Sequence, residues 1–132
     1  MLTTTTCKLA LHVSRADLEC LHTFAATALG AQPIYQEPGL VASRLPNGNL
    51  LELYGPGSCY PAYLFAHSPV VVSFQVADLG QALEQAQAAG LQVVIGPELV
   101  CSGLSYGHVQ LASGVIIGLY QENLLSTASL GC

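Results

Sequence analysis

Two side chains in the first half of the sequence have the types needed for acid–base chemistry, Glu52 and His12. Glu52 stands between Leu51 and Leu53, so in an extended strand its carboxylate faces away from both leucines. A carboxylate on a partly desolvated face suits a general base, with His12 as the group that exchanges the proton. The alternative is structural, with Glu52 paired to a cation and His12 held by a neighbour. The sequence leaves both interpretations open.

Other polar and aromatic side chains are candidates to line a binding site for an organic molecule. Polar residues alternate with apolar ones in two expected strands, where they either orient a ligand by hydrogen bonds or simply face solvent. Tyrosines gather near the expected strand ends, and aromatic walls suit a flat ligand or, equally, a dimer interface. We expect the ligand-binding residues to be Arg44, Tyr54, Tyr60, Ser73, Gln75, His108, Gln110 and Tyr120, with Glu52 and His12 as candidate catalytic residues.

Charge is scarce in this chain of 132 residues, of which 8% are charged and 52% hydrophobic, with a formal net charge of −5. The only cations are Lys8, Arg15 and Arg44, too few to neutralise a run of phosphates, which argues against a nucleic-acid or anionic-membrane partner. A surface so poor in charge predicts that apolar area is buried against a second copy, as in a homodimer.

The cysteines and the N-terminus bear on the compartment. Five cysteines, an odd number without a C-x-x-C pair, predict free thiols rather than a disulfide framework or a zinc knuckle. The first residues lack a signal-peptide pattern, and no run of about eighteen apolar residues occurs. We therefore expect a cytoplasmic protein.

The elements that carry these residues follow one order in the first half. Alternating apolar residues predict a strand over 9–13. Ser14 and Asp17 resemble a capping box that begins a helix, and Gly30 ends it. Strands are then expected over 32–36, 40–45 and 49–54, with turns at 37–39 and 46–48.

The second half repeats this order. A strand is expected over 70–76, followed by a helix that Asp78 caps and Gly90 ends. Three further strands are expected at about 91–95, 108–112 and 115–120. Residues 123–132 show no periodicity and are expected to be a tail or an arm on a neighbour.

Two matches in the letters support an internal duplication. Ala16-Asp-Leu18 corresponds to Ala77-Asp-Leu79, and Gly48-Asn-Leu-Leu-Glu-Leu-Tyr54 corresponds to Gly114-Val-Ile-Ile-Gly-Leu-Tyr120. We therefore expect one domain over 1–132, made of two βαβββ units at about 8–54 and 70–122 with a linker at 55–69.

Two tandem βαβββ units of this kind resemble the vicinal oxygen chelate superfamily, which includes glyoxalase, bleomycin resistance protein and extradiol dioxygenases. The resemblance covers about residues 8–122. It implies an α+β fold in which curved mixed sheets form a cleft, with helices on the convex side and a small-molecule site within. In metal-dependent relatives, four side chains from the first and last strands of the two units, commonly two His and two Glu, hold a divalent ion.

Glu52 is the one clear match to that ligand pattern. The corresponding positions are Glu52, Gly118, Val71 and either Ala10 or, after a two-residue insertion, Lys8. His12 enters the set only if the register of the first strand shifts. One carboxylate does not hold a divalent ion, so we expect no metal and no cofactor.

Four functions are compatible with the sequence. The first is a metal-independent binding protein that holds a hydrophobic or aromatic ligand in the cleft, as relatives that sequester antibiotics do. The second is a cofactor-free lyase, isomerase or cyclase with Glu52 as general base. The third is a metal-dependent lyase or dioxygenase of the glyoxalase type, and the fourth is a dimeric interaction module without a ligand. We place binding first, and the sequence identifies neither the ligand nor whether turnover occurs.

Overall fold

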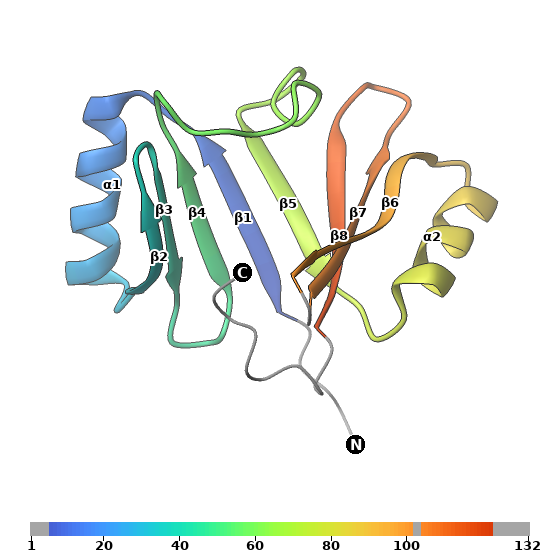
Figure 1. Ribbon diagram of the computed structural model, residues 1–132, viewed down its shortest axis with the longest axis horizontal. Helices are drawn as coiled ribbons and strands as arrows, with labels where there is room; N and C mark the ends of the chain where they lie inside the picture. Colours follow the sequence, from blue (N-terminus) through green and yellow to red (C-terminus); the bar gives the residue numbers. More distant parts are fainter. Residues whose placement is uncertain (1–5, 102–103, 123–132) are drawn as a thin grey trace. The chain divides into compact units, whose positions relative to one another are not determined.

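The computed structural model describes residues 6–101 and 104–122, so the segment expected to form a tail lies outside the described residues. Contacts divide the chain into two compact units, Thr6–Val72 and the residues from Ser73 onward. The order strand, helix, strand, strand, strand occurs twice along the chain, which confirms the predicted α+β fold class of tandem βαβββ units (Figure 1). Within the described part, neither helix is long and apolar enough to cross a membrane.

The first unit is a four-stranded mixed sheet with one helix. Its elements are β1 (Cys7–His12), α1 (Arg15–Ala28), β2 (Gln32–Glu37), β3 (Leu40–Arg44) and β4 (Leu50–Tyr54). The strands are arranged in the order β2-β3-β4-β1. The pairs β2–β3 and β3–β4 are antiparallel hairpins, whereas β1 runs parallel to β4. Such a parallel pair requires a long crossover connection, which α1, β2 and β3 provide.

Local sequence signals explain where these elements begin and end. The Ser14 side chain accepts a hydrogen bond of 3.1 Å from the Asp17 amide, which confirms the predicted cap of α1. Gly30 follows the helix with φ of +70°, a conformation that favours glycine. The hairpin between β3 and β4 closes through the Leu45 amide, which donates to the Asn49 carbonyl at 2.8 Å.

The register of β1, β3 and β4 determines which side chains share a face of this sheet. Residues directly opposite one another on paired strands point to the same side. The opposite side carries Val41 and Leu53, which are 6% and 2% exposed, and α1 packs there against β4. We call the side away from α1 the Glu52 face; its three cross-strand rows are Arg44–Leu50–Lys8, Ala42–Glu52–Ala10 and Leu40–Tyr54–His12.

The second unit has the same plan. Its elements are β5 (Val70–Gln75), which begins in the first unit, α2 (Leu79–Ala88), β6 (Gln92–Cys101), β7 (Leu104–Gln110) and β8 (Ile116–Glu122), with strands in the order β5-β8-β7-β6. The Asp78 side chain caps α2 by accepting a hydrogen bond of 3.0 Å from the Gln81 amide. Leu79 and Leu83 of α2 pack with Val109 of β7 in the core of this unit.

The strands β6 and β7 are longer than the sequence predicted, which corrects the expected ranges 91–95 and 108–112. Gly96 and Pro97 lie within β6, and pairing with β7 continues past them with a shift in register between Ile95 and Glu98. Pro97 has no amide hydrogen to donate, and β6 is the last strand in the order, where a missing donor is tolerated. The strand therefore bends around these residues and continues to Cys101.

Candidate functional site

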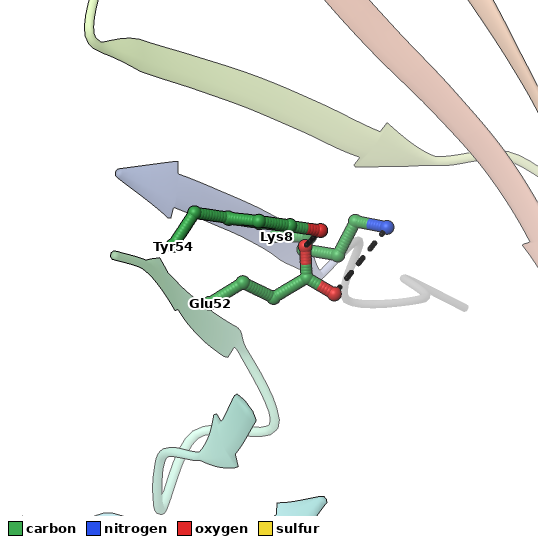
Figure 2. Close-up of polar contacts among 3 residues, drawn as sticks. All are labelled: Lys8, Glu52 and Tyr54. Atoms are coloured by element: carbon green, nitrogen blue, oxygen red, sulfur yellow. Dashed lines mark hydrogen bonds and ion pairs between the residues drawn. The ribbon is translucent and has the colours of Figure 1, made fainter. Parts of the chain in front are cut away.

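Glu52 lies in the middle of the Glu52 face with both carboxylate oxygens engaged (Figure 2). The Tyr54 hydroxyl donates to Oε1 at 3.0 Å, and Lys8 Nζ lies 3.8 Å from Oε2. The side chains of Lys8 and Glu52 are 21% and 19% exposed, so the ion pair is partly removed from water. Glu52 is thus a carboxylate with a cation beside it, the structural arrangement considered as an alternative to a free base.

Tyr54 holds this carboxylate as a neutral hydrogen-bond donor. Burial raises the pKa of the Tyr54 phenol above its ordinary value of 10.0, and the negative charge of Glu52, the hydrogen bond to Glu52 and the charge of Glu37 act in the same direction. A phenol with a raised pKa keeps its proton at neutral pH. It can therefore orient Glu52 without adding a charge to the site.

Four aromatic rings meet next to this pair, and we call them the aromatic cluster: His12, Tyr54, Tyr60 and Phe65. The ring of Phe65 stacks on His12 with centroids 5.2 Å apart, and it lies 5.1 Å from Tyr60 and 5.4 Å from Tyr54. Tyr60 and His12 are also joined by a hydrogen bond of 2.9 Å between the hydroxyl and Nε2. The linker thus places two rings against the ends of β1 and β4. The sequence placed Phe65 among the aromatic residues near the strand ends and the linker, although it was not one of the expected ligand-binding residues.

A hydrogen bond that occurs at the corresponding place within each unit establishes the register of the first strand. In each unit, the amide of the valine that follows the first strand donates to the carbonyl of a tyrosine in the last strand, at 2.8 Å in both cases: Val13 to Tyr54 and Val76 to Tyr120. Counting back five residues from these valines gives the corresponding positions Lys8 and Val71. The two-residue insertion considered from the sequence therefore lies between Val13 and Asp17, and Lys8, not Ala10, is the first-strand position.

The position that corresponds to Glu52 in the second unit is Gly118, and its surroundings are filled. A Cβ added to Gly118 would overlap the Ser73 hydroxyl, would lie 2.9 Å from the Ser73 Cβ and would lie 3.4 Å from Cδ2 of His108. Ser73 and His108 are 5% and 9% exposed. These two predicted ligand-binding residues thus occupy the space that a carboxylate side chain would need.

The residues at the four family positions do not fit a divalent ion. Lys8 places a positive charge beside Glu52, Val71 is apolar and Gly118 has no side chain. A hard or borderline ion needs several oxygen or nitrogen ligands to replace its hydration shell. Within the described ranges, no group of three or more His, Cys, Asp or Glu side chains is arranged to hold a metal ion.

The remaining predicted site residues lie in different environments. Arg44 is exposed on the Glu52 face, where its Nη1 donates to the Gly48 carbonyl at 3.4 Å. In the second unit, Gln110 donates through Nε2 to the Gly114 carbonyl at 3.1 Å, and Tyr120 is only 2% exposed. Gln75, at the end of β5, is partly buried. The first unit therefore brings together His12, Glu52, Tyr54 and Tyr60, with Arg44 elsewhere on the same face, and the second brings Ser73 and His108 together at Gly118.

Comparisons with known proteins rest on structure alone. No family model matches the sequence, and no curated protein sequence matches it significantly. Among solved structures, the chain is similar to a glyoxalase/bleomycin resistance protein/dioxygenase superfamily member from Vibrio splendidus, with 18% identity, a TM-score of 0.61, and 90% of this chain and 100% of that chain covered.

Two enzymes from Streptomyces coelicolor are also similar. A variant of methylmalonyl-CoA epimerase has 17% identity and a TM-score of 0.61, with 90% of this chain and 99% of that chain covered. A variant of 4-hydroxymandelate synthase has 13% identity and a TM-score of 0.63, with 89% of this chain and 48% of that chain covered. At such identities the likeness establishes the fold. The chain has the vicinal oxygen chelate fold that its sequence motifs predicted.

Proposed function

We propose that the chain is a metal-independent binding protein of the glyoxalase/bleomycin-resistance type, which holds a hydrophobic or aromatic small molecule. The aromatic cluster on the Glu52 face is the observation that carries this proposal. Three of its rings, those of Tyr54, Tyr60 and Phe65, come from two separate parts of the chain and lie within 5.9 Å of one another. Aromatic surface with a few placed polar groups is typical of sites for flat organic ligands.

The state of Glu52 favours binding over proton abstraction as the main activity. A general base must reach a substrate proton with a free lone pair. Here one oxygen accepts from Tyr54 and the other faces the Lys8 ammonium. A substrate proton would have to reach one of the remaining lone pairs of this paired carboxylate before Glu52 could act as the base of a cofactor-free lyase, isomerase or cyclase.

The donor set supports metal independence. Of the four family positions, Glu52 alone offers a carboxylate, and its nearest charged neighbour is itself a cation. The positive charge of Lys8 repels a divalent ion at short range. This repulsion adds to the free-energy cost of removing water from the ion.

A binding experiment with a neutral aromatic probe, naphthalene carboxamide, tests this proposal. We expect saturable binding that is unchanged by EDTA, and elemental analysis that finds less than one metal ion per chain. Phe65→Ala should weaken binding at least several-fold, because it removes the ring that contacts the other three. Phe24→Ala is the matched control, because Phe24 lies on α1, is 54% exposed and is not part of the cluster.

Three results would contradict the proposal. The probe could fail to bind at millimolar concentration, Phe24→Ala could weaken binding as much as Phe65→Ala, or EDTA could abolish binding. Circular dichroism of both variants shows whether the fold is retained, and Phe65→Leu provides a milder change that keeps apolar volume. Glu52→Gln separates binding from catalysis: we expect probe affinity within a few-fold, and a substrate whose turnover Glu52→Gln abolishes would make the chain an enzyme.

We also propose that two copies of the chain associate through apolar surface. Charged residues make up 8% of the sequence, and all six residues of β2 are exposed at the edge of its sheet. Ile34 and Tyr35 on this strand are 51% and 50% exposed. Sedimentation equilibrium should give twice the monomer mass, and Ile34→Lys should lower it. A monomer at all accessible concentrations would overturn the proposed homodimer.

A further inference from the structure

Two of the three cations of the chain share one cross-strand row of the Glu52 face. Arg44 of β3 and Lys8 of β1 stand on either side of Leu50, and the register of the sheet turns all three to the same side. The third cation, Arg15, lies in α1. In a chain with a formal net charge of −5, this row is therefore a local concentration of positive charge.

The positive row lies close to the aromatic cluster. Lys8 Nζ and the Tyr54 hydroxyl approach different oxygens of the same Glu52 carboxylate, at 3.8 and 3.0 Å (Figure 2). The cation and the hydroxyl of the first ring of the cluster thus contact the same carboxylate group. Glu52 lies in the row between the Arg44–Lys8 row and the row that contains Tyr54. Its neighbours in that row are alanines, Ala42 and Ala10, whose side chains are short.

Acidic and basic side chains are distributed unevenly over the Glu52 face. Glu52 lies 3.8 Å from Lys8, an ion-pair distance that is longer than a hydrogen bond. Glu37 pairs with Leu40 in the row that contains Tyr54, at the aromatic end. Negative charge therefore lies toward the aromatic end and positive charge toward the Arg44–Lys8 row. An anionic group is thus attracted to the Arg44–Lys8 row and repelled by Glu37 at the aromatic end.

We infer that this site takes a small aromatic carboxylate, whose ring contacts the aromatic cluster and whose anionic group binds Lys8 and Arg44. The inference rests on the proposed function and names the class of ligand. A guanidinium offers paired donors that match a carboxylate, and an ammonium offers three donors on a flexible stem. Because Lys8 and Tyr54 contact the same Glu52 carboxylate, the site suits a ligand whose anionic group is held close to its ring.

The test compares naphthalene carboxylate with naphthalene carboxamide, which share the ring and differ in charge. For the unmodified chain at low salt we expect the carboxylate to bind about tenfold more tightly, an effect reduced from that of a buried pair because both cations are partly or fully exposed. Lys8→Met should abolish this preference, so that the two probes bind with equal affinity. Arg44→Met should reduce the preference, and Arg15→Met, the control on α1, should leave it unchanged.

The outcomes separate the two proposals. Failure of both probes to bind overturns the proposed function, and the ligand class with it. Equal affinity for the two probes overturns the ligand class alone, because aromatic binding then remains without selection for charge. A loss of preference in Arg15→Met equal to that in Lys8→Met also overturns it, since overall charge would then be responsible. If Lys8→Met does not fold, Arg44→Met tests the ligand class instead, because Arg44 is exposed. An unchanged preference for the carboxylate probe in Arg44→Met would then overturn the inference.

Discussion

Replacing Gly118 with alanine should destabilise the chain through a single, identifiable contact. The added Cβ would overlap the Ser73 hydroxyl and lie 2.9 Å from the Ser73 Cβ, closer than real Cβ contacts. Gly118 does not have a positive φ, so alanine meets no backbone strain and the cost is one of packing alone. Overpacking a buried site costs about 1–3 kcal/mol. Ser73 is 5% exposed and lies in a strand, so we expect the upper half of that range.

Equilibrium urea unfolding of four proteins measures this contact as a double-mutant cycle. The variants are Gly118→Ala, Ser73→Gly and the double substitution, beside the unmodified chain. Ser73→Gly removes both atoms that the new Cβ would meet, so the double variant should be more stable than the sum of the single effects by at least about 1 kcal/mol. Gly80→Ala is the control, because its Cβ would approach only Asp78 Oδ1, at 3.7 Å.

The reasoning would be refuted by additive effects in this cycle. If Gly118→Ala cost less than about 0.5 kcal/mol, the sheet would be accommodating the methyl group without displacing Ser73. If Gly80→Ala cost as much as Gly118→Ala, loss of glycine itself would be responsible, not the crowding of β8 against β5. In either case the statement that Gly118 has no room for a larger side chain would be wrong.

Three further predictions concern the first unit. Ser14→Ala should lower the free energy of unfolding by about 1 kcal/mol, measured in urea, because the Asp17 amide loses its cap acceptor. Tyr60→Phe should cost about 0.5 kcal/mol by the same method, since it removes the hydrogen bond to His12 but keeps the ring. The raised pKa of Tyr54 means that the folded chain keeps a proton that the unfolded chain loses above about pH 10. Stability from this group is therefore complete below pH 10 and declines above it, by at most about 1.4 kcal/mol per pH unit, and Tyr54→Phe should make that decline shallower in urea unfolding at pH 9 to 11.

The sequence was sufficient to predict those features of the fold that depend on neighbouring residues. Helix caps and glycine stops involve atoms three or four residues apart, so Ser14, Asp78 and Gly30 could be interpreted directly. The course of β6 could not be predicted in this way. Its bend at Gly96 and Pro97 is compensated by pairing with β7, the next strand along the chain.

In the candidate site too, residues could be predicted from short motifs, whereas contacts between residues far apart in the sequence could not. Glu52 was predicted from its motif, but the partner that defines its chemistry, Lys8, depends on the register of β1. That register follows from the hydrogen bond between Val13 and Tyr54, which the letters do not reveal. Phe65 lies in a linker without periodicity, where no pattern indicates which way a side chain points.

Lys8 and Glu52 form a charged pair, whereas the corresponding residues of the second repeat, Val71 and Gly118, are uncharged. A carboxylate on a partly desolvated strand requires a positive partner, and in the first unit Lys8 provides it at 3.8 Å from Glu52. The corresponding positions of the second βαβββ repeat carry neither charge, and Ser73 fills the space beside Gly118. The arrangement in the first unit is consistent only as a pair, because Glu52 with valine in place of Lys8 would be an uncompensated anion. Charge and volume at these positions must therefore change together. For that reason a single substitution at any one of them is not expected to create a metal site.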